Sequence, residues 1–269
     1  MDIKEKPIGV FDSGIGGLTV LKEILKALPY ENTVYLGDTA RVPYGIRSPE
    51  TVLRYSFENT RFLISKNIKL LVIACNTSSA ISLDSIKEAV NIPVIGVIEP
   101  GARAAVKATR NKIIGVIGTE ATIKSNSYAK AIKKLDEKIS VIELACPLFV
   151  PLVEEGWTDG MIASLITEKY LGSFKNTNID TIVLGCTHYP LLKKVISDVM
   201  GPKVILIDSA IETASEIKNI LKTSGLERNK EGSTFREFFV TDSVEKFKNI
   251  GEKFLGEKIN NIEKIQLGG

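Results

Sequence analysis

Two of the three cysteines follow apolar runs of the same kind. Residues 70–74 lead into Cys75 and residues 181–185 lead into Cys186, and hydroxyl or amide side chains typical of helix starts follow each thiol. A thiol between a buried strand and a helix lies near the positive end of the helix dipole, so we expect its pKa to fall from about 8.5 toward neutrality. Such a thiol can give or take a proton. A buried structural cysteine is the alternative for either one alone, and the pairing favours chemistry.

The single histidine, His188, lies two residues after Cys186. Beside a thiol it could orient the sulfur, tune its ionisation or contact a substrate carboxylate, whereas an isolated imidazole in a core or on a surface is the ordinary alternative. Three cysteines and one histidine could also complete a zinc site. The cysteines lack the C-x2-C spacing of structural zinc, so we predict no metal.

A glycine-rich turn follows the first apolar run. Asp12 and Ser13 end that run, and the glycines after them let the backbone approach a ligand while the next helix directs N–H groups at an anion. The Gly-Lys-Ser/Thr of a phosphate loop is missing, so a small carboxylate fits better than a nucleotide. Asp12 could instead cap the helix. In the loop that follows, the backbone at Pro43, Tyr44 and Gly45 could bind a carboxylate while Tyr44 covers the site.

The elements that must position these residues form an alternating pattern. Short apolar runs near residues 8, 33, 70, 94, 113, 140, 181 and 204 are each followed by a turn and a stretch of helical period. This alternation predicts an α/β fold with parallel sheets. Three strand ends repeat in order, those at 8–13, 70–75 and 93–99 resembling those at 114–119, 181–186 and 202–208. The repeat predicts a duplicated unit.

The repeat places the two thiols relative to each other. Ligands of open α/β sheets bind at the carboxyl ends of strands. If two such units face each other, Cys75 and Cys186 reach one cleft from opposite sides, and a chiral carbon between them can be approached on either face.

Composition sets broad limits on the protein. A chain of 269 residues buries a sizeable core without disulfides or metals, and its 35 basic and 32 acidic residues are spread along the sequence. This spread argues against nucleic acid as the main partner. We expect no membrane span and no signal peptide, hence a cytoplasmic protein whose cysteines remain thiols. We also expect a homodimer.

Five segments together resemble the glutamate racemases of the aspartate/glutamate racemase superfamily: FDSGIGGLTV at 11–20, GDTARVPYG at 37–45, ACNTSSA at 74–80, GVIEPGA at 96–102 and GCTHYPLL at 185–192. The resemblance implies an isomerase that interconverts L- and D-glutamate without a cofactor and supplies D-glutamate for peptidoglycan. It also implies two similar, pseudo-symmetric α/β domains with the site between them. The expected ranges are 1–98 for the first domain and 99–208 for the second, with 209–269 returning to complete the first.

The resemblance also implies residue roles. Cys75 matches the thiol that takes the proton from D-glutamate and Cys186 the one that takes it from L-glutamate, while Asp12 assists the former and His188 the latter. Glu154 matches a carboxylate near the second thiol, and Cys146 matches no catalytic position. The implied substrate contacts are Asp12, Ser13, Pro43, Tyr44, Gly45, Asn76, Thr77, Thr119, Thr122, Thr187 and His188.

Three other functions stay open at this point. A related racemase could act on aspartate or another acidic amino acid, and a substrate panel separates that case. A two-domain protein could close on a carboxylate without reacting, and it would not need paired cysteines. A thiol redox protein would depend on an oxidant.

Overall fold

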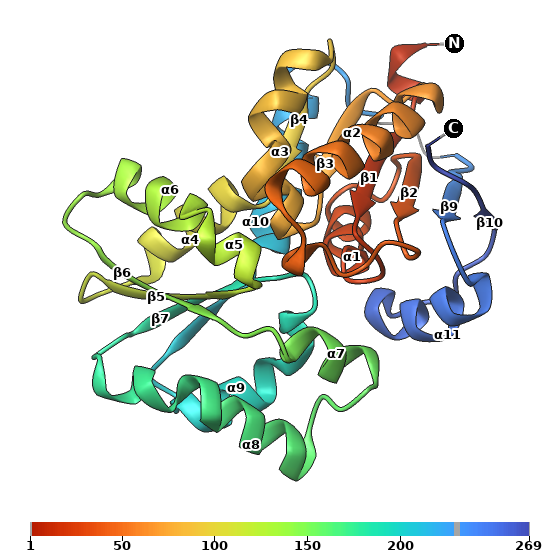
Figure 1. Ribbon diagram of the computed structural model, residues 1–269. Coiled ribbons are helices and arrows are strands. Elements are labelled where there is room, and N and C mark those ends of the chain that lie inside the picture. The colour runs from red at the N-terminus through yellow and green to blue at the C-terminus, as the bar shows by residue number, and fades with distance from the viewer. Residues whose placement is uncertain (1, 229–231, 269) are drawn as a thin grey trace.

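The computed structural model describes residues 2–228 and 232–268, and it contains two parallel β-sheets flanked by helices (Figure 1). The first sheet has the strand order β10-β9-β2-β1-β3-β4 and the second has β6-β5-β7-β8. The strands are β1 (Ile8–Asp12), β2 (Thr33–Gly37), β3 (Leu70–Ile73), β4 (Val94–Gly96), β5 (Ile113–Gly118), β6 (Ser140–Ala145), β7 (Thr181–Gly185), β8 (Ile205–Ile207), β9 (Arg236–Val240) and β10 (Ile262–Lys264).

Helices connect the strands and cover both faces of each sheet. They are α1 (Leu18–Ala27), α2 (Pro49–Ser65), α3 (Asn76–Ala89), α4 (Ile98–Ala108), α5 (Glu120–Lys124), α6 (Ser127–Leu135), α7 (Phe149–Glu154), α8 (Gly160–Leu171), α9 (Lys193–Met200), α10 (Ser209–Thr223) and α11 (Val244–Leu255). Short 3-10 segments are η1 (Ile3–Glu5), η2 (Tyr44–Ile46), η3 (Gly172–Asn176) and η4 (Tyr189–Leu192).

The predicted duplication is confirmed by the strand order. The order β2-β1-β3-β4 in the first sheet is repeated as β6-β5-β7-β8 in the second. The three repeated strand ends fall on β1 and β5, on β3 and β7, and on β4 and β8. Each half therefore contains the same four-stranded parallel α/β unit, as the predicted fold class requires, and the first sheet has two further strands.

Side chains that alternate along the strands build a core on both faces of the first sheet. Ile8 and Val10 on β1 pack with α1 and α10, whereas Phe11 faces the cluster that includes Leu63 of α2 and Ile86 of α3. All of these side chains are buried. Two-sided burial explains why the parallel strands are continuous apolar runs.

The second sheet is covered in the same way. Ile114 and Val116 on β5 face α4 and α6. Ile182 and Leu184 on β7 belong to the cluster that includes residues of α7, α8 and α9. Helix α10 packs on both α1 and α4, so it joins the two halves.

The last part of the chain returns to the first sheet. Strand β9 pairs with β2 from Thr33 opposite Arg236 to Gly37 opposite Val240, and β10 pairs with β9. The apolar pattern did not predict these two strands. The proposed ranges 1–98, 99–208 and 209–269 stay a prediction, and positions 1, 229–231 and 269 within them lie outside the described residues.

A buried ionic cluster fixes the start of this return. Lys69 Nζ lies 2.5 Å from Glu31 Oε2, with both side chains at most 1% exposed. Lys69 Nζ also donates to the carbonyl oxygen of Leu226 at 2.9 Å, and the Arg228 amide donates to Glu31 Oε1 at 2.8 Å. Removing one member would leave a buried charge without its partner, which commonly costs about 3–5 kcal/mol.

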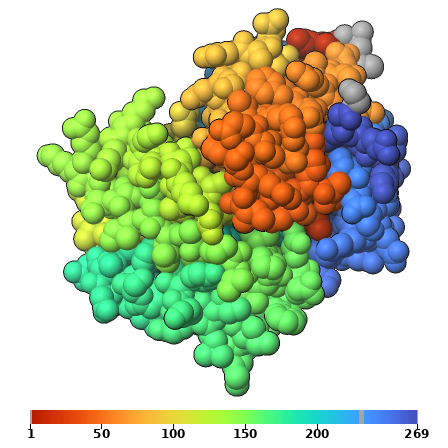
Figure 2. Space-filling view, viewed as in Figure 1, coloured from red at the N-terminus to blue at the C-terminus, as the bar shows by residue number. Residues whose placement is uncertain are grey.

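The two halves are in direct contact. On the face shown in Figure 2, the orange surface of the N-terminal half lies against the green surface from the middle of the chain. Helix α5 contacts η2 across this boundary. None of the helices in the described part of the chain is long and apolar enough for a membrane span.

Candidate active site

A small cavity lies where the carboxyl ends of the two sheets meet. Strands β1 and β3 lead into it from the first half, and β5 and β7 lead into it from the second. It is lined by Ser13, Val42, Pro43, Tyr44, Gly45, Cys75, Asn76, Thr77, Thr119, Val150, Cys186, Thr187 and His188. Both predicted thiols therefore border the same space, each from its own half of the molecule.

The glycine-rich turn after β1 lies against the loop after β7. Asp12 is fully buried, and its Oδ2 accepts a hydrogen bond from the Gly14 amide at 2.9 Å. A Cβ atom on Gly16 would lie 2.2 Å from Thr187 Oγ1 and 2.6 Å from His188 Nδ1. Glycine at position 16 is therefore what allows the two loops to pack so closely.

Cys75 stands between β3 and the first residue of α3, as predicted. Its sulfur lies 3.7 Å from Ser13 Oγ. The predicted fall of its pKa is wrong, because burial and the neighbouring carboxylate of Asp12 raise the pKa of Cys75 to about 11. Loss of water around the thiolate outweighs the helix dipole here, and Cys75 is a protonated thiol near neutral pH.

Cys186 has a basic partner. Its sulfur lies 3.9 Å from His188 Nδ1, and His188 is 2% exposed. Burial lowers the pKa of His188, but Cys186, Glu154 and Asp12 together raise it to about 10. The imidazole is therefore protonated near neutral pH, so an imidazolium cation lies beside the second sulfur.

Glu154, at the end of α7, is the counterion of this imidazolium. Its Oε1 lies 3.3 Å from His188 Nε2, in an ion pair that is not aligned as a hydrogen bond. His188 holds the pKa of Glu154 below its usual range despite partial burial. On α11, Phe254 packs edge-on against the imidazole with ring centres 5.7 Å apart. The C-terminal segment thus helps to hold His188 in place.

Three hydroxyl groups meet across the boundary between the halves. Thr77 Oγ1 lies 2.9 Å from Thr119 Oγ1 and 3.2 Å from Thr122 Oγ1, and the last two are 3.0 Å apart. A Cβ atom on Gly45 would lie 2.4 Å from Thr119. Thr77 and Thr119 also line the cavity, so this group of hydroxyls joins the two halves at its wall.

Tyr44 lines the cavity but does not present its hydroxyl group to it. The hydroxyl donates to Asp38 Oδ2 and accepts from Asn59 Nδ2 at 3.0 Å, and the ring packs on Tyr55 with centres 5.4 Å apart. The side chain is 1% exposed. Tyr44 therefore anchors its loop in the first half, so its backbone and ring are the parts that can meet a ligand.

Most of the predicted site residues lie together. Asp12, Thr122 and Glu154 are outside the cavity lining, and each supports a neighbour through the contacts given above. Sequence reasoning missed Val42 and Val150, which line the cavity, and Asp38, which holds Tyr44. The sequence around the two valines gives no indication that they line a cavity. Asp38 directly follows β2, where a strand-end carboxylate was a usable signal. Cys146 is fully buried in the core.

The cavity is small. The centre of a water molecule can occupy about 20 Å³ of it, which is room for about one water. An amino acid with two carboxylates needs more space, so the halves must separate or the lining side chains must move before a substrate can bind.

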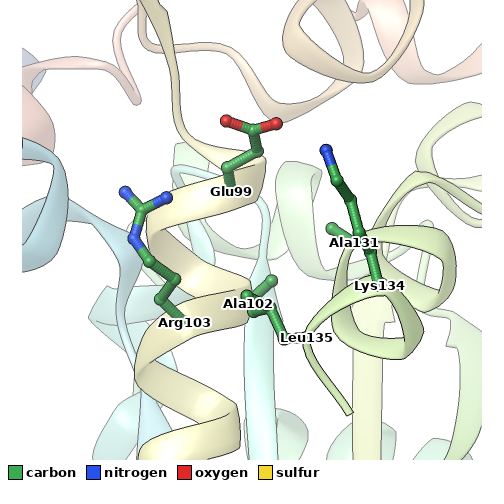
Figure 3. A pocket seen from close by; sticks show the side chains of 6 residues that line it. All are labelled: Glu99, Ala102, Arg103, Ala131, Lys134 and Leu135. Atoms are coloured by element: carbon green, nitrogen blue, oxygen red, sulfur yellow. The ribbon is translucent and has the colours of Figure 1, made fainter. Parts of the chain in front are cut away.

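Other depressions carry different residues. The one between α4 and α6 is lined by Glu99, Ala102, Arg103, Ala131, Lys134 and Leu135 (Figure 3). Arg103 pairs there with Glu216 of α10. None of the predicted site residues lines this depression. Among residues 2–228 and 232–268, no group of three or more His, Cys, Asp or Glu side chains is arranged to hold a metal ion.

Comparison with known proteins gives consistent matches over nearly the whole chain. The family model for Asp/Glu/Hydantoin racemase matches residues 8–217. A glutamate racemase of Geobacter metallireducens is 54% identical over 262 residues, 97% of each chain. The crystal structure of glutamate racemase RacE1 from Bacillus anthracis has a TM-score of 0.94 at 44% identity, covering 98% of each chain. That of the Francisella tularensis glutamate racemase in complex with D-glutamate has a TM-score of 0.93 at 40% identity, with the same coverage.

Proposed function

Since the chain belongs to the Asp/Glu/hydantoin racemase family and is an amino-acid racemase, we propose that it interconverts L- and D-glutamate by proton transfer between two thiols. The observation that carries this proposal is the position of Cys75 and Cys186. They follow the equivalent strands β3 and β7 and border one cavity from opposite halves. The relatives named glutamate racemase support glutamate as the substrate.

The chemical difficulty is the weak acidity of the α-hydrogen beside a carboxylate. A dry site lowers this barrier with donors that are already oriented toward the carboxylate on which negative charge builds up. Asn76 and Thr77 at the start of α3, and Thr187 after β7, line the cavity, and we assign their backbone and side-chain donors to the substrate carboxylates. No electron-accepting cofactor enters this scheme.

With L-glutamate, the Cys186 thiolate takes the α-proton and the Cys75 thiol donates its proton to the opposite face. The bond from the α-carbon to hydrogen breaks on one side as a new one forms on the other, so the configuration inverts. The imidazolium of His188 donates a hydrogen bond to the Cys186 sulfur while it is anionic. Cys75, whose pKa is about 11, begins this half of the cycle protonated, as an acid must.

With D-glutamate the roles reverse, and Cys75 must first lose its proton. Burial raises the pKa of Asp12, which makes this carboxylate a better base at neutral pH. We assign Asp12 as the residue that assists deprotonation of Cys75.

The decisive experiment incubates L-glutamate with the purified chain and measures both enantiomers by chiral chromatography. The expected result is an approach to equal amounts of L- and D-glutamate, because enantiomers have the same free energy. L-aspartate in a parallel reaction separates the proposal from a racemase of another acidic amino acid. Tight binding without turnover would instead indicate a carboxylate-binding protein.

A role in supplying D-glutamate for peptidoglycan is the cellular part of the proposal. A bacterial strain that requires added D-glutamate should grow without it when it expresses this chain. A Cys186→Ser variant is the matched control and should not restore growth. The homodimer stays a prediction, and light scattering of the purified chain tests it.

A further inference from the structure

A buried tyrosine outside the cavity lining contacts a residue of the site. Tyr128, the second residue of α6, is fully buried in the second half. Its hydroxyl donates to Asn76 Oδ1 in the first half at 2.7 Å. Asn76 directly follows Cys75 and lines the cavity. This hydrogen bond therefore crosses the boundary between the halves and ends on a site residue.

Two glycines make the space that the tyrosine ring occupies. A Cβ atom on Gly185, immediately before Cys186, would lie 3.1 Å from Tyr128 Cε2. A Cβ atom on Gly101 of α4 would lie 3.2 Å from Cε1 and 3.3 Å from the hydroxyl oxygen. The ring belongs to the buried cluster that also contains residues of α4 and α6, the two helices that line the depression in Figure 3. Its position leaves little freedom for the hydroxyl group.

The tyrosine hydroxyl is the donor of this hydrogen bond. It has a single hydrogen, which is directed at Oδ1 of Asn76. Ser209, at the start of α10, lies close to the same hydroxyl, since a Cβ atom on Gly101 would lie 3.1 Å from Ser209 Cβ and 3.3 Å from the Tyr128 hydroxyl oxygen.

This polarity decides which way the Asn76 amide points. An asparagine side chain has an acceptor oxygen and a donor nitrogen of nearly equal size, and only its partners distinguish the two orientations. Because Oδ1 of Asn76 is engaged by a donor, the two hydrogens on Nδ2 remain for the cavity. A carboxylate needs donors, and the flipped amide would present an oxygen to it.

We propose that Tyr128 is a positioning residue, which turns the amide hydrogens of Asn76 toward a carboxylate of the bound substrate when the two halves are closed. The inference rests on the proposed function, since glutamate is the ligand. Tyr128, a residue of the second half, would thereby support substrate binding by Asn76 of the first half.

Tyr128→Phe tests the proposal, because it removes the hydroxyl and keeps the ring. Affinity for D- and L-glutamate is measured by calorimetry in the Cys75→Ser background, where the added enantiomer is not consumed. We expect Kd to rise about tenfold for both enantiomers, the upper range for one hydrogen bond. Tyr170→Phe is the matched control. The Tyr170 hydroxyl accepts a hydrogen bond of 3.2 Å from the Leu148 amide, and neither residue lines the cavity. The Kd of this variant should stay within about twofold of the parent value.

A double-mutant cycle separates positioning from packing. In an Asn76→Ala background, Tyr128→Phe should have no further effect on Kd, because the amide that it orients is gone. An equal loss in both backgrounds would overturn the proposal, as would an unchanged Kd for Tyr128→Phe. If Tyr128→Phe fails to fold, the parent chain is titrated with glutamate and the side-chain amide of Asn76 is followed by NMR. Its Nδ2 hydrogens should shift on binding, and unchanged resonances overturn the proposal.

The binding assay is independent of turnover. If the chain does not racemise glutamate but Tyr128→Phe weakens its binding, the proposed function fails and the positioning role stands. If the chain racemises glutamate and Tyr128→Phe binds it as tightly as the parent, the positioning role alone fails.

Discussion

Asp12 at the end of β1 accepts a hydrogen bond from the Thr187 hydroxyl on the loop after β7, at 3.3 Å. A buried carboxylate of the first half is thus joined to the loop that carries the second half's thiol and imidazole. Asp12 also raises the pKa of Cys75 on one side and that of His188 on the other. Because His188 belongs to the second half, the effect of Asp12 on the pKa of His188 depends on the two halves being in contact.

Replacing either thiol should stop the reaction in both directions. Cys75→Ser and Cys186→Ser each remove a group that one direction uses as acid and the other as base, and a loss of about 10³-fold or more in kcat/KM is expected. Because enantiomers have equal free energy, kcat/KM must fall by the same factor from either side. Circular dichroism of reactions started from each enantiomer measures kcat/KM in the two directions.

Cys146→Ala is the control for the thiol variants. Cys146 is buried in the core and lies outside the cavity lining, so its loss should reduce stability while kcat/KM stays near that of the parent. Near-normal turnover in either Cys75→Ser or Cys186→Ser would rule out the two-thiol mechanism.

Glu154→Gln should move the pH profile of the reaction. Glu154 holds the proton on His188, so without the carboxylate the pKa of His188 falls below about 10. The decline of kcat/KM at high pH should then begin at lower pH, with a loss of about tenfold near neutrality, typical of a charged interaction. Glu155→Gln removes the neighbouring exposed carboxylate and should leave the profile unchanged. Identical profiles for both variants would contradict the assigned role.

The stability contribution of His188 should decrease as the pH rises. Its pKa is raised from 6.5 to about 10 in the folded chain, so the folded state binds the proton more tightly than the unfolded chain. This contribution is fully present below pH 6.5 and is lost as the pH passes through about 10. The difference in Tm between the parent and His188→Asn should therefore be largest in the acidic part of the range. A difference that grows toward pH 10 would mean that the imidazole is neutral in the folded protein.

A methyl group at position 16 should disturb closure. In Gly16→Ala the new Cβ would meet Thr187 and His188 at less than normal contact distance, so the loops must separate. A fall in kcat/KM of about a hundredfold is expected, the scale of a displacement of about 1 Å at reacting groups. Gly172→Ala, whose new Cβ would meet only Glu168 at 3.4 Å, is the control. Equal activity of the two variants would show that the close approach is not needed.

Hydrogen exchange with solvent tests the opposed geometry. In deuterated water, product formed early should carry deuterium at the α-carbon while recovered substrate keeps its original hydrogen, because different thiols remove and return the proton. Mass spectrometry of separated enantiomers measures both. Early deuterium in recovered L-glutamate would instead indicate one base that serves both faces.

The sequence predicted the parts of the fold that local patterns encode. Strands buried on both faces, such as β3 and β7, are continuous apolar runs, and the repeated strand ends placed Cys75 and Cys186 correctly. The apolar pattern did not predict strands β9 and β10, because they lie toward one edge of the sheet and β10 has only three residues, two of them charged.

Features that depend on three-dimensional context could not be predicted. The pKa of Cys75 is governed by burial and by Asp12, 63 positions earlier in the chain, and these outweigh the local helix dipole. Tyr128 gains its role from Asn76, Gly101 and Gly185, none of which is near it in sequence. Such contacts have no periodicity to reveal them.

The late return of the chain to the first sheet bears on how the protein is synthesised. Strands β5 to β8 are contiguous in sequence, so all four strands of the second sheet have been synthesised by residue 207. The first half then still exposes the edge of β2, which is covered only when β9 arrives with residues 236–240. An uncovered strand edge invites pairing with other chains. Both thiols precede β9 in the chain, yet the half that carries Cys75 is completed only when β9 is in place. A chain that stops after β8 would contain both cysteines and still present a strand edge prone to aggregation.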